Sequence, residues 1–172
     1  ALLVASALAM AGYASAAIDH PLHGDRIITM GDESFDSGDY LNLLSLLTAR
    51  DNTRQSIADI MSFRLALNAV NDSTGLVDLN ASEVHFMGQS LGAIYGTGAI
   101  ALANKSLSGD LAAFDSMYAF QTATINVPTG GLAAGLFDSA AFGPNIKGTL
   151  LSATSDEFVE FLTAFVVQNG IP

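Results

Sequence analysis

The sequence predicts an α/β protein in which crossover helices join the strands of a parallel sheet. Half of the 172 residues are hydrophobic and only 13% are charged, so much of the chain is expected to be buried. Short apolar runs typical of buried strands occur at 13–18, 84–87 and 117–127. Segments with apolar residues at helical spacing separate these runs, which is the order that builds strand–helix–strand units.

The N-terminal part predicts a helix followed by a strand. Residues 1–11 are rich in Ala and Leu, and Gly12 is a suitable residue to end a helix. Residues 13–18 are expected to form a strand buried on both faces. Residues 22–39 are rich in Gly, Asp and Ser, which favours a loop at the ligand-binding edge of the sheet. The opening residues are also compatible with a signal peptide or membrane helix, but no basic region precedes them and we favour the helix.

The middle of the chain predicts a crossover helix and a second strand. Apolar residues at helical spacing run through 41–70, and polar residues near Arg50 predict a break in this helix. After the turn-prone residues 71–75, the strand at 84–87 leads directly into Gly-Gln-Ser-Leu-Gly. Five polar residues of the crossover helix are expected to form a solvated or ion-paired face: Arg50, Asp51, Arg54, Gln55 and Asp59.

Beyond Pro128 the pattern changes to short helices. One is predicted at 132–137 and another at about 155–168, where Thr154 and Glu157 have the spacing of a capping box. The apolar residues of the second helix fall three and four apart, and core packing is the favoured interpretation of this stripe: Phe158, Phe161, Leu162, Phe165 and Val166. With no linker and no repeat, residues 1–172 are expected to be a single domain.

The segment Gly88–Gly92 has the pattern of a nucleophile elbow. A serine hydroxyl is a weak nucleophile, so it needs a nearby general base and donors for the developing oxyanion. In such an elbow the serine occupies a strained strand-to-helix turn, and glycines two residues to either side prevent collisions. Ser90 is therefore the candidate nucleophile, with the backbone N–H of Leu91 as an oxyanion donor. The alternative is that Ser90 is an ordinary helix N-cap between two glycines that allow close packing.

Four stretches in this order resemble bacterial extracellular lipases of the Pla-1/cef type, a branch of the α/β-hydrolases. They are AMAGYASAAIDHPLHGDR, LLTARDNTRQSIADI, VHFMGQSLGAIYGTG and INVPTGGLAAGLFDSAAFGP. The resemblance implies a partial α/β-hydrolase fold, with residues 1–127 as a sheet core and 128–172 as a helical cap or lid. It also implies that Ser90 is the nucleophile, that Leu91 donates to the oxyanion, that the substrate is an acyl ester or lipid, and that the protein is extracellular or cell-surface.

The histidines do not complete a catalytic triad in the usual order. In α/β-hydrolases the chain order is Ser, then Asp or Glu, then His, but His20, His23 and His85 all precede Ser90. We therefore expect residues 1–172 to be an internal segment of a larger hydrolase, inactive alone, with the second oxyanion donor also elsewhere. His20 and His23 are expected to stabilise a loop that shapes the site, and His85 to be buried and hydrogen-bonded.

Charge and composition limit the partners. The formal net charge of −11 argues against nucleic acid and anionic membrane surfaces, and no integral membrane span is expected. There are no cysteines and no acidic residues at convincing spacing from the histidines, so neither a metal nor a cofactor is expected. Two alternatives to a lipase or esterase remain: another acyl hydrolase such as a thioesterase or peptidase, and a non-catalytic hydrolase-like binding domain.

Overall fold

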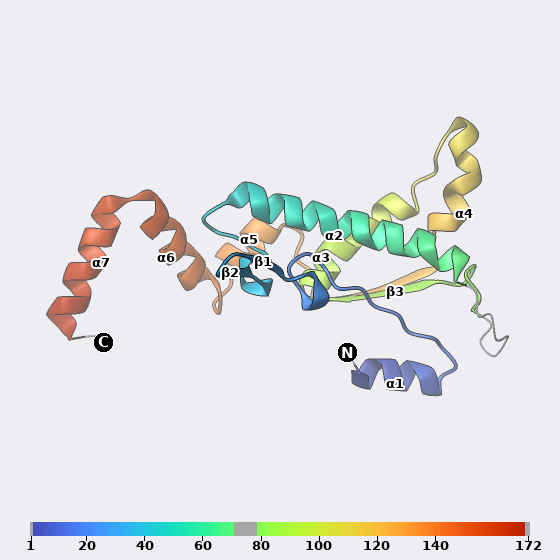
Figure 1. The fold of residues 1–172 in the computed structure, drawn as a ribbon, viewed down its shortest axis with the longest axis horizontal. Coiled ribbons are helices and arrows are strands. Elements are labelled where there is room, and N and C mark those ends of the chain that lie inside the picture. Colours follow the sequence, from blue (N-terminus) through green and yellow to red (C-terminus); the bar gives the residue numbers. More distant parts are fainter. Residues whose placement is uncertain (1, 71–78, 171–172) are drawn as a thin grey trace.

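The computed structural model describes residues 2–70 and 79–170 and has a mixed α/β architecture (Figure 1). The predicted turn at 71–75 lies outside the described residues. Seven α-helices and four strands are present in the described ranges. In chain order they are α1 (Leu2–Met10), β1 (Ile28–Met30), β2 (Glu33–Phe35), α2 (Leu46–Ala66), β3 (His85–Gln89), α3 (Leu91–Ala103), α4 (Asp115–Tyr118), β4 (Thr122–Asn126), α5 (Leu132–Phe137), α6 (Gly143–Thr154) and α7 (Asp156–Asn169).

The centre of the fold is a parallel β3–α3–β4 unit. β3 and β4 pair over their full lengths, from His85 opposite Thr122 to Gln89 opposite Asn126. The predicted second and third strands, and a helix directly after Ser90, are therefore confirmed. The third strand starts later than predicted, because Met117 lies within α4. This unit is a small parallel sheet with a crossover helix.

The core lies between α2, α3 and one face of this sheet. Its buried residues are Tyr40, Ile60, Tyr95, Ala99, Ala103 and Phe120. Small residues in α3 let it approach its neighbours: a side chain at Gly96 would overlap the ring of Phe86, and one at Gly98 would lie 3.0 Å from Ile57 Cδ1. The run of small apolar residues after Ser90 therefore has a packing function.

Two predictions for the N-terminal part are wrong. Residues 13–18 form no strand and are largely exposed, although the ring of Tyr13 packs edge-on against His85. A strand requires a partner, and none of the described residues pairs with this run. The predicted loop at 22–39 contains a hairpin of β1 and β2, whose two-residue turn begins at Gly31 with φ of 64°.

The predicted break near Arg50 is also wrong, because α2 continues through it as one helix of 21 residues. The two residues considered as caps have other partners, since Asp51 pairs with the side chains of Arg50 and Arg54 and Asn52 bonds to a backbone carbonyl. Asn52 donates its side-chain amide to the Tyr40 carbonyl, and Thr53 donates its hydroxyl to the Ala49 carbonyl one turn earlier. Side chains used in this way do not interrupt a helix.

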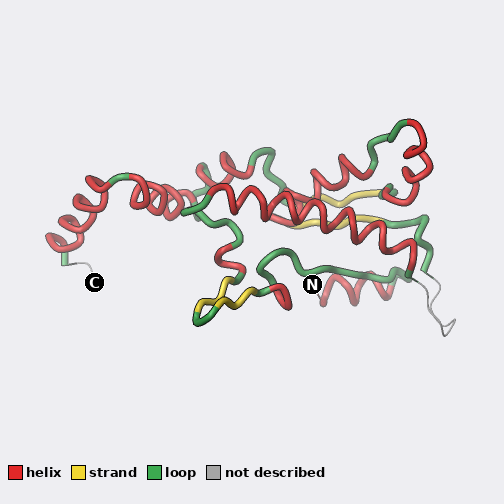
Figure 2. The backbone as a smooth tube through the Cα atoms, turned by 45° about the horizontal axis from the view of Figure 1, so that its top comes forward, coloured by secondary structure: helices red, strands yellow, loops and turns green. Residues whose placement is uncertain are grey.

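The C-terminal helices α6 and α7 extend away from the body of the molecule (Figures 1 and 2). The helix predicted at 132–137 is confirmed as α5, and α6 was not predicted. Ser155, rather than Thr154, caps α7 by accepting a hydrogen bond from the Phe158 N–H. The predicted core packing of the α7 stripe is wrong, since Phe161 is 63% exposed.

Within the described ranges, 2–70 and 79–170, no helix combines the length and apolar character needed to cross a membrane.

Candidate functional site

Ser90 occupies a strained turn between β3 and α3. Its φ and ψ are 52° and −122°, a conformation that residues with a side chain rarely adopt. Its N–H donates to the Asn126 carbonyl at 3.0 Å, which extends the pairing with β4, and its carbonyl accepts from Ala93 N–H at 2.8 Å. The serine is thus the last residue paired with the sheet and the first acceptor of the helix.

The Ser90 hydroxyl does not serve as a helix cap. An ordinary N-cap serine has extended backbone angles and accepts a hydrogen bond from the first turn of its helix. Ser90 has neither feature: its φ is positive and its side chain makes no capping hydrogen bond. The residue is exposed. Ser90 is therefore the N-cap residue of α3 by position, but its side chain does not cap the helix and its hydroxyl is left available for other chemistry.

The two flanking glycines differ in what they contribute. A Cβ at Gly88 would lie 2.6 Å from the Gly92 carbonyl oxygen and 2.8 Å from Phe86 Cε1, so no side chain fits there without movement of the backbone. A Cβ at Gly92 would meet only the Tyr95 hydroxyl, at 4.0 Å. We expected that a side chain would collide with its surroundings at either position. This prediction is confirmed at Gly88 and is wrong at Gly92.

Leu91 is the first residue of α3. The first N–H groups of a helix have no acceptor within the helix, and they carry the positive end of the helix dipole. The side chain of Leu91 packs partly buried against the core, which leaves only its backbone for polar contacts. A negative charge that formed beside Ser90 would therefore lie near an N–H group that can donate a hydrogen bond to it.

Residues 19–26 form a loop that packs over α2 and α3. The ring of His20 lies 4.6 Å from that of Tyr95, centroid to centroid, and the ring of His23 lies 5.3 Å from that of Tyr40. Tyr95 is one helical turn after Leu91, so His20 brings the loop close to the start of α3. His23 also makes the kind of hydrogen bond expected within this loop, with its Nδ1 2.8 Å from the Pro21 carbonyl oxygen.

An ion pair between Arg26 and Asp59 ties the same loop to α2. Arg26 also donates to the Asp19 carbonyl at 3.0 Å, and Gln55 donates to the second Asp59 oxygen at 2.7 Å. The rest of the polar face matches the prediction of an ion-paired surface, with Arg50 and Arg54 both beside Asp51. Asp59 is thus the member of this cluster that has a role in positioning the loop.

Burial shifts the pKa values of His20 and Tyr95, under this loop, in the directions that favour their uncharged forms. It lowers the pKa of His20, an effect that the Asp59 carboxylate opposes and that His23 and Arg26 reinforce. His20 Nδ1 is buried with no hydrogen-bond partner in the described residues. Burial and the nearby Tyr40 raise the pKa of Tyr95 to about 12. Neutral His20 therefore packs against a neutral Tyr95.

His85 lies at the opposite end of β3 from Ser90. At the rise of an extended strand, five residues separate the two by about 16 Å, too far for proton transfer. Its Nδ1 is 2.8 Å from Thr122 Oγ1 on β4. The predicted hydrogen bonding of His85 is confirmed, but its predicted burial is wrong, because the residue is exposed.

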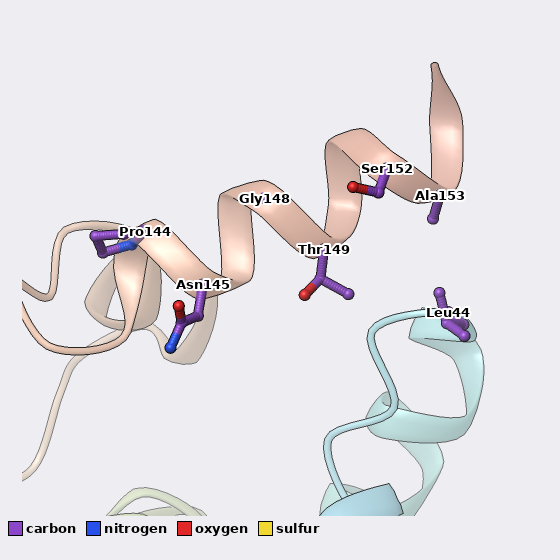
Figure 3. A pocket seen from close by; sticks show the side chains of 7 residues that line it. All are labelled: Leu44, Pro144, Asn145, Gly148, Thr149, Ser152 and Ala153. Atoms are coloured by element: carbon purple, nitrogen blue, oxygen red, sulfur yellow. The ribbon is translucent and has the colours of Figure 1, made fainter. Parts of the chain in front are cut away.

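Two hollows in the described structure are lined by residues other than Ser90. One, of about 560 Å³, lies between Leu44 and a face of α6 that carries Asn145, Thr149 and Ser152 (Figure 3). The other, of about 440 Å³, lies at the far end of α3 and includes Leu102. Among the described residues, no group of three or more His, Asp or Glu side chains converges in a way that could hold a metal ion.

The described structure thus defines an α/β protein with an exposed serine at a strained strand-to-helix turn. Comparison with known proteins gives no match, since no family model, curated protein or solved structure is significantly similar to the chain. The functional assignment consequently depends on the geometry and on the motif. Val127, which directly follows β4, also has a positive φ, and no pattern in the local sequence predicts this conformation.

Proposed function

We propose that the chain is part of a serine hydrolase of acyl esters, a lipase or esterase of the α/β-hydrolase type, with Ser90 as the nucleophile. The observation that carries this proposal is the backbone of Ser90, with φ of 52° and a hydroxyl not used in capping. Such strain is costly and is concentrated at functional sites. The motif's resemblance to Pla-1/cef-type lipases supports the same class and an extracellular or cell-surface location.

In the proposed reaction the Ser90 hydroxyl oxygen attacks the ester carbonyl carbon while a general base takes its proton. The negative charge that forms on the carbonyl oxygen is stabilised by the Leu91 N–H, which has no acceptor within α3. The alcohol then leaves with the proton, and an acyl group remains on Ser90. Water hydrolyses this acyl-enzyme with the help of the same base and regenerates the serine.

The base is proposed to come from outside residues 1–172. His85 is too far along β3, and among the described residues no histidine nitrogen is hydrogen-bonded to the Ser90 hydroxyl. His20 and His23 are engaged with Tyr95 and Tyr40. A histidine after Ser90 in a longer chain would agree with the order of residues in α/β-hydrolases.

The exposed surface supports the proposal of a larger fold. The accessible area is 11,943 Å², compared with about 8,000 Å² from the usual scaling of surface with mass for a compact monomer. The face of the β3–β4 sheet away from α3 is open, and Met87 on it is 53% exposed. We propose that further strands and helices cover this surface, and that the helices α5, α6 and α7 belong to a cap or lid.

Hydrolysis by the protein in its full natural length tests the proposal. Oxygen esters with acetyl to dodecanoyl chains, an acyl thioester and a peptide amide would be compared, with Ser90→Ala as the control. We expect the esters to be hydrolysed and the variant to lose at least a thousandfold in kcat. Preference for the thioester or the amide would indicate another acyl hydrolase. Absence of any turnover that depends on Ser90 would favour the non-catalytic binding domain.

A further inference from the structure

Three residues other than glycine have positive φ angles in the described structure, and two of them directly follow the paired strands β3 and β4. They are Leu22 at 63°, Ser90 at 52° and Val127 at 52°. Leu22 belongs to the loop that packs over α3, while Ser90 and Val127 directly follow β3 and β4. Because strained backbone collects at functional sites, Val127 requires an explanation as Ser90 does.

The local sequence of Val127 opposes its conformation twice. A β-branched side chain is a genuine outlier at positive φ, because its two γ-carbons crowd the backbone. The next residue is Pro128, which favours extended angles for the residue before it. Glycine or asparagine would adopt this conformation at less cost. A valine at this position is therefore more consistent with a use for its side chain than with the needs of the turn.

The sheet register places Val127 beside the proposed nucleophile. Gln89 pairs with Asn126, and the Ser90 N–H donates to the Asn126 carbonyl at 3.0 Å. Val127 directly follows that residue at the end of β4, a strand that runs about 4.8 Å from β3. It is 69% exposed. An exposed apolar residue thus comes immediately after the strand whose last carbonyl bonds to the Ser90 N–H.

We propose that Val127 is a specificity-determining residue that contacts the acyl chain of the ester bound at Ser90. The inference rests on the proposed function and adds to it the residue that recognises the apolar part of the substrate. The contact buries methyl groups of the acyl chain against Val127, so it favours longer acyl chains over acetyl. It makes no contribution to bond breaking.

The test compares chain-length preference in the full-length protein with Val127→Thr and Val127→Ala. Threonine keeps the branched shape and replaces one methyl group by a hydroxyl, whereas alanine removes both methyl groups. For both variants we expect the ratio of kcat/KM for octanoyl to acetyl esters to fall about tenfold, with the acetyl value within threefold of wild type. Val70→Thr and Val70→Ala are matched controls, because Val70 is a half-exposed valine that directly follows the helical turn Leu67–Ala69. This turn bonds to the segment before β4 through Asn68 and Met117, whereas Val127 follows the other end of β4.

Three other results would each overturn the inference, and the measured rates distinguish them. An unchanged octanoyl-to-acetyl ratio, with turnover that still depends on Ser90, would contradict the role of Val127 and leave the proposed function intact. An equal loss for both esters would show that Val127 maintains the backbone rather than contacting the acyl chain. Wild-type protein without Ser90-dependent turnover would overturn the proposed function and this inference together.

Discussion

At the scale of single residues, the site depends on the backbone more than on side chains. The sequence was sufficient to predict the turn at Ser90, because a strand, a glycine at the one crowded position and a helix of small residues are all local signals. It was not sufficient for Val127, whose position next to the Ser90 turn follows from the pairing of β4 with β3 across the intervening helix α3. Non-local pairing of this kind leaves no local pattern to read.

We predict that Gly88→Ala destabilises the protein and that Gly92→Ala does not. The new Cβ at Gly88 would be 2.6 Å from a backbone oxygen, so α3 would have to move away from β3. We expect a loss of about 1–3 kcal/mol in the free energy of unfolding, typical of overpacking. Gly92→Ala is the matched control, with its nearest atom at 4.0 Å. Urea unfolding measures both, and equal stabilities of the two variants would contradict the close approach of α3.

We predict that His20 makes the protein less stable as the pH falls. The pKa of His20 in the folded protein lies below the ordinary value of 6.5. At a pH between the folded-state pKa and 6.5, the unfolded chain therefore binds more protons than the folded protein does. Stability should therefore fall as the pH drops through this window and level off below the folded-state pKa. The charged or titratable groups that act on the ring are Asp19, His23, Arg26 and Asp59.

The control for this prediction is His20→Phe, which keeps a ring against Tyr95 but has no titratable nitrogen. Urea unfolding at pH 7.5 and pH 5 should show a smaller loss of stability for the variant than for the wild type. The same pH dependence in both proteins would show that His20 does not titrate in its buried position.

At the scale of elements, helices were predicted better than strands. The helical spacing in α2 and α7 is local, whereas residues 13–18 have a strand-like composition but no strand to pair with in the described residues. Within α2, Arg64 links three segments. Its buried guanidinium donates to the backbone carbonyls of Ala119, Ala81 and Ser116, and it lies over the ring of Phe120. Arg64 thus ties the segments that precede β3 and β4 to α2.

We predict that Arg64→Met destabilises the protein by about 2–4 kcal/mol. Methionine would fill the space but leave buried backbone carbonyls without donors, each at a cost of about 1–3 kcal/mol. Arg54→Met, on the exposed side of the same helix, should change stability by no more than about 0.5 kcal/mol. Thermal and urea unfolding would distinguish them. A loss as small for Arg64→Met as for Arg54→Met would show that water or other donors satisfy these carbonyls.

At the scale of the whole molecule, the structure has more surface than its mass requires. The excess comes from the open face of the sheet and from α6 and α7, which stand apart from the core (Figure 2). The low charge content predicted extensive burial, and in the described structure Phe161, Phe165 and Val167 of α7 remain exposed instead. The composition of a chain indicates how much apolar surface needs to be buried, but it does not indicate which segments cover that surface.

We predict that residues 1–172, expressed alone, self-associate and bind a hydrophobic dye. Exposed apolar patches and unpaired strand edges both promote association. Size-exclusion chromatography with light scattering would show species larger than a monomer, and Phe161→Glu with Phe165→Glu should reduce their size. A soluble monomer that melts cooperatively would contradict this prediction and the proposal of a larger fold.

The central claim is that Ser90 is an activated nucleophile, and covalent labelling tests it most directly. A fluorophosphonate would be added to the full-length protein, to its Ser90→Ala variant and to residues 1–172 alone, with peptide mass spectrometry to locate the adduct. We predict one adduct on Ser90 in the full-length protein, none in the variant and none in the isolated segment, which lacks the base. Full-length protein that stays unlabelled, or that is labelled equally after Ser90→Ala, would contradict the account.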